Sequence, residues 1–276
     1  HRTIPYLYRS STVPEKFSLG RFLREIFETL ANPSFAALFL ASLFSFVAAG
    51  VSAALTFYIY GYFWGFESDQ SGLITASVVL SALGAFVLAP RVSRALGKKR
   101  AAIIVGILAF SIAPAPIVLR LFGLMPENGD PALFPIIFGV VVADMCLIIM
   151  VQILMQSMIA DLVEDSQTRT ARRSEGVFFA AISFTRKAVE GGGILIASAL
   201  LAIIDFPVGR PPSEVPEEAL FRLGAFYAPT LFTLWMIMLA CLSFYRIDRA
   251  RHEANLTELG LGEAPEFVTE MSSRPD

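Results

Sequence analysis

Hydrophobic residues dominate six long segments of the chain, and short polar connections separate them. The segments cover residues 35–64, 72–89, 101–121, 133–160, 177–204 and 225–245. Each is near or above the ~20 residues that a helix needs to cross the hydrocarbon core of a bilayer. The pattern therefore predicts an all-α integral membrane protein with six transmembrane helices and a lipid bilayer as its solvent.

Two segments carry local signals of irregular geometry. The first is longer than a bilayer requires, so it is expected to tilt or to extend past the membrane. Its end, residues 57–66, reads FYIYGYFWGF, an aromatic cluster typical of a membrane interface. Pro114 and Pro116 are expected to bend the third segment, because proline lacks a backbone N–H. In the fifth segment, glycines 191–193 indicate close helix packing.

Composition agrees with membrane insertion. Hydrophobic residues make up 55% of the chain and charged residues only 17%, whereas soluble domains have about 25% charged residues. No basic cluster is interleaved with aromatic residues and the net charge is −2, so no nucleic-acid partner is expected. Cys146 and Cys241 lie in apolar segments, which indicates neither a disulfide nor a metal site.

The distribution of Lys and Arg predicts the orientation. Seventeen of the 22 Lys and Arg residues fall in connections on one side of the six segments, and only Arg120, Arg210 and Arg222 fall on the other. The positive-inside rule then places both ends of the chain in the cytoplasm. The expected location is a plasma membrane, specifically the inner membrane of a bacterium.

The domain organisation follows from these segments. Residues 1–32 are expected to form a cytoplasmic loop with an amphipathic interfacial helix near 18–30. Residues 33–248 would be the six-helix transmembrane unit, and residues 249–276 a cytoplasmic tail. The chain starts at His1 with a polar stretch and without a signal-peptide pattern, so it reads as the middle of a longer protein.

Ionisable residues inside the apolar segments are few: Asp144 in the fourth, and Arg186, Lys187 and Glu190 in the fifth. A charge at mid-bilayer costs about 2.5–3.5 kcal/mol on insertion scales, so such residues usually face a partner or a watery cavity. Lys187 lies ~18 Å along a helix from Glu175, near the membrane centre.

These charges predict a polar cavity. Asp144, Gln152 and Gln156 fall within an arc of about 120° on the fourth helix, so they could face the polar side of the fifth. A second interpretation is structural: Arg186 and Glu190 are spaced as an ion pair on one helix, and a neighbouring helix could hold Asp144. Both interpretations remain open from the residues alone.

The connection between the fourth and fifth segments is densely charged. Acids close the fourth helix and bases precede the fifth; the set includes Asp161, Glu164, Asp165, Arg169, Arg172, Arg173 and Glu175. This order suggests breakable ion pairs that lock the cytoplasmic side. The alternative is a solvated loop that simply obeys the positive-inside rule.

These residues resemble the glycoside–pentoside–hexuronide:cation symporters, the melibiose-permease type of the major facilitator superfamily. The similar pattern consists of Ala160-Asp161, Glu164, Arg173, Glu175-Gly176 and Lys187. Gly97-Lys98-Lys99 also matches the superfamily's loop motif, although Arg94 stands where an acid is usual. The resemblance covers the carboxyl-terminal half of the family fold, helices seven to twelve, and the loop before them.

The resemblance implies a secondary transporter that works by alternating access. Lys187 would line the cavity and couple solute and cation occupancy, and Asp161, Glu164 and Arg173 would form a cytoplasmic gate against the missing amino-terminal half, a partner within the same protein. That half would supply most of the ligands of the coupling cation, Na⁺ or H⁺. It would also supply most of the contacts with the transported solute, a sugar, a glycoside or a related small molecule. Arg186 and Glu190 lie outside the family pattern, so their candidacy rests on depth and charge.

A six-helix channel or receptor subunit without coupled transport is the alternative function. Neither HExxH nor GxSxG occurs, and the two histidines, His1 and His252, lie outside the segments, so an enzyme is not expected. No resident cofactor or metal is expected.

Overall fold

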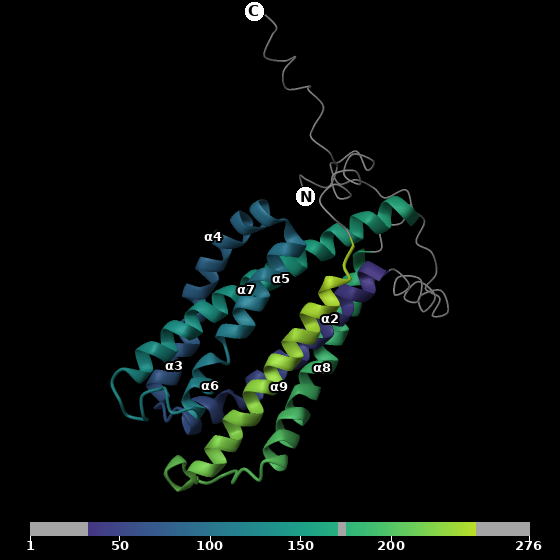
Figure 1. Cartoon of the computed structure of the whole chain (residues 1–276). Helices are drawn as coiled ribbons and strands as arrows, with labels where there is room; N and C mark the ends of the chain where they lie inside the picture. The colour runs from purple at the N-terminus through teal and green to yellow at the C-terminus, as the bar shows by residue number, and fades with distance from the viewer. Residues whose placement is uncertain (1–32, 171–174, 247–276) are drawn as a thin grey trace, which may run out of the picture.

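A computed structural model describes residues 33–170 and 175–246 (Figure 1). This part of the chain is helical and contains no β-strand. The axes of its long helices lie roughly parallel to one another (Figure 1). The elements are α2 (Pro33–Phe57), the π-helix η2 (Tyr58–Phe63), α3 (Ser68–Ala76), α4 (Val78–Leu96), α5 (Lys98–Ile112), α6 (Ala115–Leu121), α7 (Leu133–Thr170), α8 (Glu175–Ile203), the short 3₁₀ helix η3 (Pro212–Glu214) and α9 (Glu217–Ser243).

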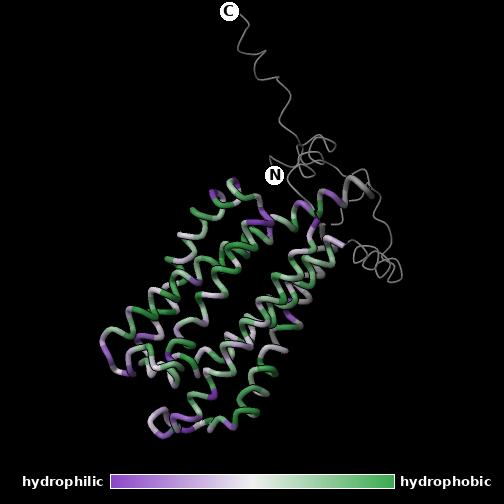
Figure 2. Tube along the Cα trace, viewed as in Figure 1, coloured by the Kyte–Doolittle hydropathy of each residue, from purple (hydrophilic) through white to green (hydrophobic). Residues whose placement is uncertain are grey.

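All six predicted segments are helical. Five stretches have the length and hydropathy of a membrane span: Pro33–Phe63, Ser68–Leu96, Lys98–Leu121, Leu133–Val163 and Glu217–Ser243. Helix α8 occupies the fifth predicted segment and has 29 residues, so it is about 43 Å long at 1.5 Å per residue. Hydrophobic residues follow the helices and hydrophilic ones gather at their ends (Figure 2). The fold is therefore an all-α membrane fold.

One boundary differs from prediction. Helix α7 continues to Thr170 rather than ending near 160, because the polar stretch that follows Ala160 contains no Pro or Gly to stop it. The sequence after Pro216 allows the sixth helix to start early, within Glu217–Phe226, and helix α9 does begin at Glu217. The predicted interfacial helix near 18–30 and the tail from 249 lie outside the described residues.

The third segment is interrupted, as its prolines predict. Helix α5 ends at Ile112, and α6 begins at Ala115 with Pro116 in its first turn. Pro114 and Pro116 have no N–H, so the carbonyls of Phe110 and Ile112 lose the donors that a continuous helix would supply. The result is a two-part helix with a break inside the bundle.

The aromatic end of the first segment is packed inward more than a membrane-interface belt requires. Tyr62, Phe63, Trp64 and Phe66 are all buried. The backbone passes through wide turns, in which the N–H of Trp64 donates to the carbonyl of Ile59 at 3.0 Å. Wide π turns inside helices are uncommon and often occur at functional sites. This segment forms one end of the bundle's hydrophobic core.

Helix packing divides the bundle into two neighbouring groups. Helix α2 packs along α8 and α9, α7 packs along α4 and α5, and α5 also contacts α9. The contact of α4 with α7 uses small residues, because Ser77, Ser81, Ala85 and Ala89 are buried at four-residue spacing. The Ser81 hydroxyl donates to the carbonyl of Val142 on α7 at 3.0 Å. Small residues and interhelical hydrogen bonds are the usual means of packing in membranes.

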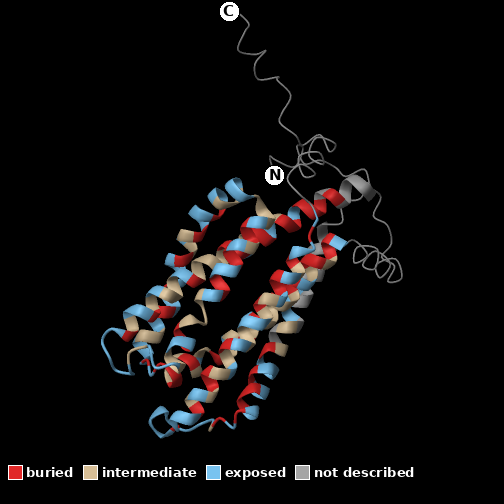
Figure 3. Ribbon diagram, viewed as in Figure 1, coloured by how far each residue is buried: buried red, intermediate tan, exposed pale blue. Residues whose placement is uncertain are grey.

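Much apolar surface faces outward. Val79, Leu83 and Phe86 on α4 are more than half exposed, and exposed residues occur along the outer helices (Figure 3). In water, apolar patches of this extent mark an interaction surface. For a membrane fold they match contact with lipid or with further transmembrane helices.

Gly193 permits the closest approach between α2 and α8, and Gly193→Ala is expected to destabilise the protein. An added Cβ would lie 2.6 Å from both the carbonyl carbon and the Cα of Gly50. Because these are backbone atoms, the helices must separate, at a cost of about 1–3 kcal/mol. Thermal unfolding of the full-length protein in detergent measures the effect.

The neighbouring glycine is a matched control. A Cβ at Gly192 meets nothing within 4 Å, so Gly192→Ala should leave stability unchanged or raise it by up to about 1 kcal/mol through helix propensity. Equal unfolding temperatures for the two variants would show that the glycine contact does not set the spacing of α2 and α8.

Candidate functional site

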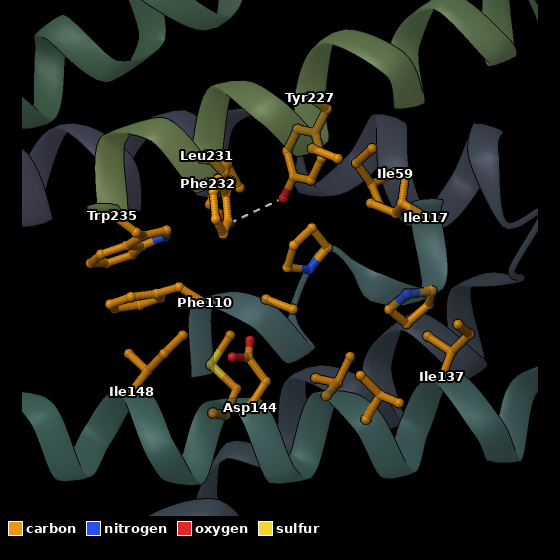
Figure 4. Close-up of a pocket in the computed structure, with 18 of the residues that line it drawn as sticks. Ile59, Phe110, Ile117, Ile137, Asp144, Ile148, Tyr227, Leu231, Phe232 and Trp235 are labelled. Carbon is orange, nitrogen blue, oxygen red and sulfur yellow. Dashed lines mark hydrogen bonds between the residues drawn. The ribbon is translucent and has the colours of Figure 1, made fainter. Parts of the chain in front are cut away.

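A cavity of about 120 Å³ lies inside the bundle, enclosed by α2 and η2, the break between α5 and α6, α7 and α9 (Figure 4). Most of its walls are apolar or aromatic, including Phe110, Ile137 and Trp235. Its side-chain oxygens come from Ser52 on α2, Tyr60 on η2, Asp144 on α7 and Tyr227 on α9. Four elements far apart in sequence therefore converge on one small polar group.

Asp144 is the charged member of this group. Its side chain points into the cavity from α7 (Figure 4), and the residue is only 8% exposed. Its Oδ1 atom is buried and has no hydrogen-bond partner in the structure. Across the cavity, the Tyr227 hydroxyl and the Ser52 hydroxyl lie 3.4 Å apart as a hydrogen-bonded pair. The cavity thus contains one buried carboxyl group that is incompletely satisfied.

The predicted grouping of Asp144 with Gln152 and Gln156 needs correction. Both glutamines are exposed, whereas Asp144 is buried in the internal cavity. An arc of about 120° on a helix is wide enough to include both buried and exposed positions. On α7, Asp144 is buried, and Gln152 and Gln156 are exposed. Asp144 therefore does not share a surface with the two glutamines.

Two charged residues of α8 also lie away from this cavity. Arg186 and Lys187 are exposed, and neither lines the cavity. Helix α8 packs along α2, while α7 packs along α4 and α5, so the two helices have different principal neighbours. The Glu190 side chain lies outside what the structure describes. A role for these residues in a solute pathway stays a prediction.

At the opposite end of α7, Asp161 binds Lys98 at the start of α5. The Lys98 ammonium donates to both carboxylate oxygens, with Nζ 2.6 Å from Oδ1 and 2.8 Å from Oδ2. The Asp161 side chain is 7% exposed and that of Lys98 is 30% exposed. A largely buried, two-oxygen contact of this kind is stronger and more specific than an exposed ion pair.

The next residue binds a different helix. The Lys99 ammonium donates to the carbonyl of Tyr245, just after α9, at 2.6 Å. The Tyr245 hydroxyl donates to the carbonyl of Met158 on α7 at 3.3 Å, and the Arg246 N–H donates to the Ser34 hydroxyl on α2 at 3.2 Å. We call Lys98, Lys99, Asp161 and Tyr245 the lysine clamp. It joins the start of α5 to α7 and to the chain just after α9.

The sharp turn before these lysines depends on Gly97. Its φ is +78°, in a region that favours glycine, and it ends α4 immediately before α5 begins. The loop motif Gly97-Lys98-Lys99 and the acid Asp161 were identified separately from the sequence. The structure shows that they form one contact, a partnership that sequence spacing did not indicate.

The other predicted gate residues are not placed. Arg173 lies outside the described residues, and the side chains of Glu164 and Glu175 are not among those described. Sequence reasoning also missed the cavity residues Ser52, Tyr60 and Tyr227. The available signal was weak: a few hydroxyl groups within otherwise apolar segments, which usually hydrogen-bond locally or across helices.

The opposite end of the bundle carries a cation held by aromatic rings. The Arg120 guanidinium lies 4.9 Å from the Phe63 ring centroid and 5.1 Å from that of Trp64. It also donates to the side-chain oxygen of Asn128. Cation–π contacts of this type stabilise partly desolvated sites, so this arginine fixes α6 against the end of the first span.

The chain matches a protein-family model. The model of a family described as MFS/sugar transport protein matches residues 2–249, a range that includes all the helices described above. No curated protein matches the chain.

Proposed function

Because the chain belongs to the MFS/sugar transport family, a family of major facilitator transporters, we propose that it contributes six helices to a secondary active transporter. These helices would form the carboxyl-terminal half, helices seven to twelve, and a preceding amino-terminal half would complete the solute pathway. The two halves would rock around a central site. The observation that carries this proposal is the family match over an all-α membrane fold.

The proposed cargo is a sugar, a glycoside or a related small solute. The internal cavity is too small for such a solute: it measures about 120 Å³, and a cavity of about 150 Å³ accommodates benzene. The solute pathway is therefore proposed to use polar residues that would face the other half. Gln152 and Gln156 on α7 and Arg186 and Lys187 on α8 are exposed. Glu190 is included from its position in the sequence alone.

The proposed cytoplasmic gate uses Asp161, Glu164, Arg173 and Glu175. The contact between Lys98 and Asp161 supports part of it, because it puts a fixed charge pair at the end of α7. The proposed orientation has both ends of the chain in the cytoplasm, in a plasma membrane such as the bacterial inner membrane. Coupling to Na⁺ or H⁺ is proposed, with most cation ligands in the amino-terminal half.

Reconstitution of the full-length protein tests this proposal. In proteoliposomes, an inward Na⁺ or H⁺ gradient should drive solute above its external concentration, and an ionophore that dissipates the gradient should abolish the accumulation. A channel, the alternative function, would only equilibrate the solute at any gradient. Equilibration without accumulation for every tested sugar would therefore favour the channel.

A further inference from the structure

We propose that Asp144 is a proton-binding residue and that the internal cavity is a proton site within this half of the protein. The site is additional to the cation ligands expected in the amino-terminal half. Binding of the proton rests on the geometry described here; its use in transport rests on the proposed function.

The first argument is the state of the carboxyl group. Asp144 is more than nine-tenths buried, and its Oδ1 has no hydrogen-bond partner in the structure. A carboxylate can accept about four hydrogen bonds, so a buried one with an unused oxygen is costly. Asp144 is one of the residues that line the cavity, and its side chain points toward it from α7 (Figure 4). The carboxyl group therefore borders the cavity, although Oδ1 itself is covered.

The second argument is the absence of a counter-ion. Tyr60 faces the cavity from η2, Tyr227 from α9, and Ser52 from α2. The break between α5 and α6 presents Phe110, Pro114 and neighbouring apolar residues, and α7 itself adds Met145 and Ile148. Helix α4 contacts the other side of α7 near Asp144 through Ser81 and Gly84. None of the described residues that line the cavity is Lys, Arg or His.

Energy then favours a proton. An ionised carboxylate at this depth costs about 2.5–3.5 kcal/mol on the insertion scale, and no lining cation offsets that cost. Binding of H⁺ from water converts the carboxylate to a neutral carboxylic acid; no other bond is made or broken and no co-reactant is needed. The new O–H could donate to the oxygen of a cavity tyrosine.

The same geometry disfavours a metal cation. Hard metal cations need a shell of six or more oxygens, or retain much of their water. The cavity offers one carboxyl group, two phenols and one serine hydroxyl, and the Ser52 and Tyr227 hydroxyls already bond to each other. A proton needs only the unused oxygen of Asp144. The cavity also has room for water molecules that could deliver it.

Infrared difference spectroscopy on the full-length protein in lipid tests the proposal. As the pH is lowered in potassium buffer, a protonated-carboxyl C=O band should appear at a frequency typical of a non-polar site. The band should vanish in Asp144→Asn and persist in Asp69→Asn, a matched change at an exposed acid on α3. If Asp144→Asn does not fold, Asp144→Glu should move the band instead.

Two outcomes would overturn the assignment: no such band in the unaltered protein, or a band unchanged by both substitutions at 144. The measurement needs neither solute nor gradient, so a channel would give the same spectrum. Failure of the transport proposal is thereby separable from failure of the proton site.

Discussion

Replacing Lys187 with alanine is expected to abolish concentrative uptake by the full-length protein while leaving its expression and membrane insertion unchanged. Lys187 is exposed on α8, about 18 Å along the helix from Glu175. A lysine at this depth opposes membrane insertion by about 2.5–3.5 kcal/mol on insertion scales. Its loss should therefore not weaken the fold, and an effect on accumulation would indicate a role in solute or cation occupancy.

Two variants sharpen this experiment. Lys187→Arg keeps the positive charge and should retain part of the accumulation if charge is what matters. Arg100→Ala removes an exposed cation at the start of α5 and should transport normally. Accumulation by Lys187→Ala at the wild-type level would remove this lysine from the mechanism, and equal losses in Lys187→Ala and Arg100→Ala would point to a non-specific charge effect.

Removing Lys98 is expected to lower the free energy of unfolding by about 2 kcal/mol, measured as Lys98→Met in detergent. The estimate lies between the 0–1 kcal/mol of exposed pairs and the 3–5 kcal/mol of fully buried ones, roughly as the partial exposure of Lys98 requires. The Asp161 carboxylate, which is 7% exposed, would lose its contact with the Lys98 ammonium. In the double variant with Asp161→Asn, much of this loss should be recovered.

The same pair should influence conformation. Asp161→Asn is expected to change the balance of inward- and outward-open forms, because it removes the charge contact between α7 and Lys98 at the start of α5. Rates of cysteine labelling at one position on each membrane face measure this balance in the full-length protein. Identical rates in Asp161→Asn and the parent would refute the gate. Strictly additive losses in the double variant would show that the Lys98–Asp161 contact carries little energy.

The course of the chain through the membrane was predictable because it depends on local sequence. Within the described residues, runs of apolar residues located the long helices, and Pro114 with Pro116 located the break in the third segment. Glycines 191–193 were expected to mark close helix packing, and Gly193 does lie against the backbone of Gly50. End points were harder: α7 runs on to Thr170, since polarity alone does not stop a helix that lacks Pro and Gly.

The surroundings of individual side chains were not predictable in the same way. Helical periodicity put Asp144, Gln152 and Gln156 on one arc, but the neighbours of α7 decide where that arc becomes buried. Ser52 and Tyr227 approach the Asp144 cavity from segments 175 positions apart. Lys98 and Asp161 are 63 positions apart. Contacts between residues so far apart in sequence depend on tertiary packing, which local sequence patterns do not predict.

The lysine clamp has a mechanical consequence. Two adjacent residues of one tight turn hold different helices: Lys98 binds α7, and Lys99 binds the chain just beyond α9. A displacement of that turn should therefore move α7 and the end of α9 together. During any rocking motion the ends of α7 and α9 should travel together at constant separation, whereas α8, whose principal contact is α2, has more freedom to move independently.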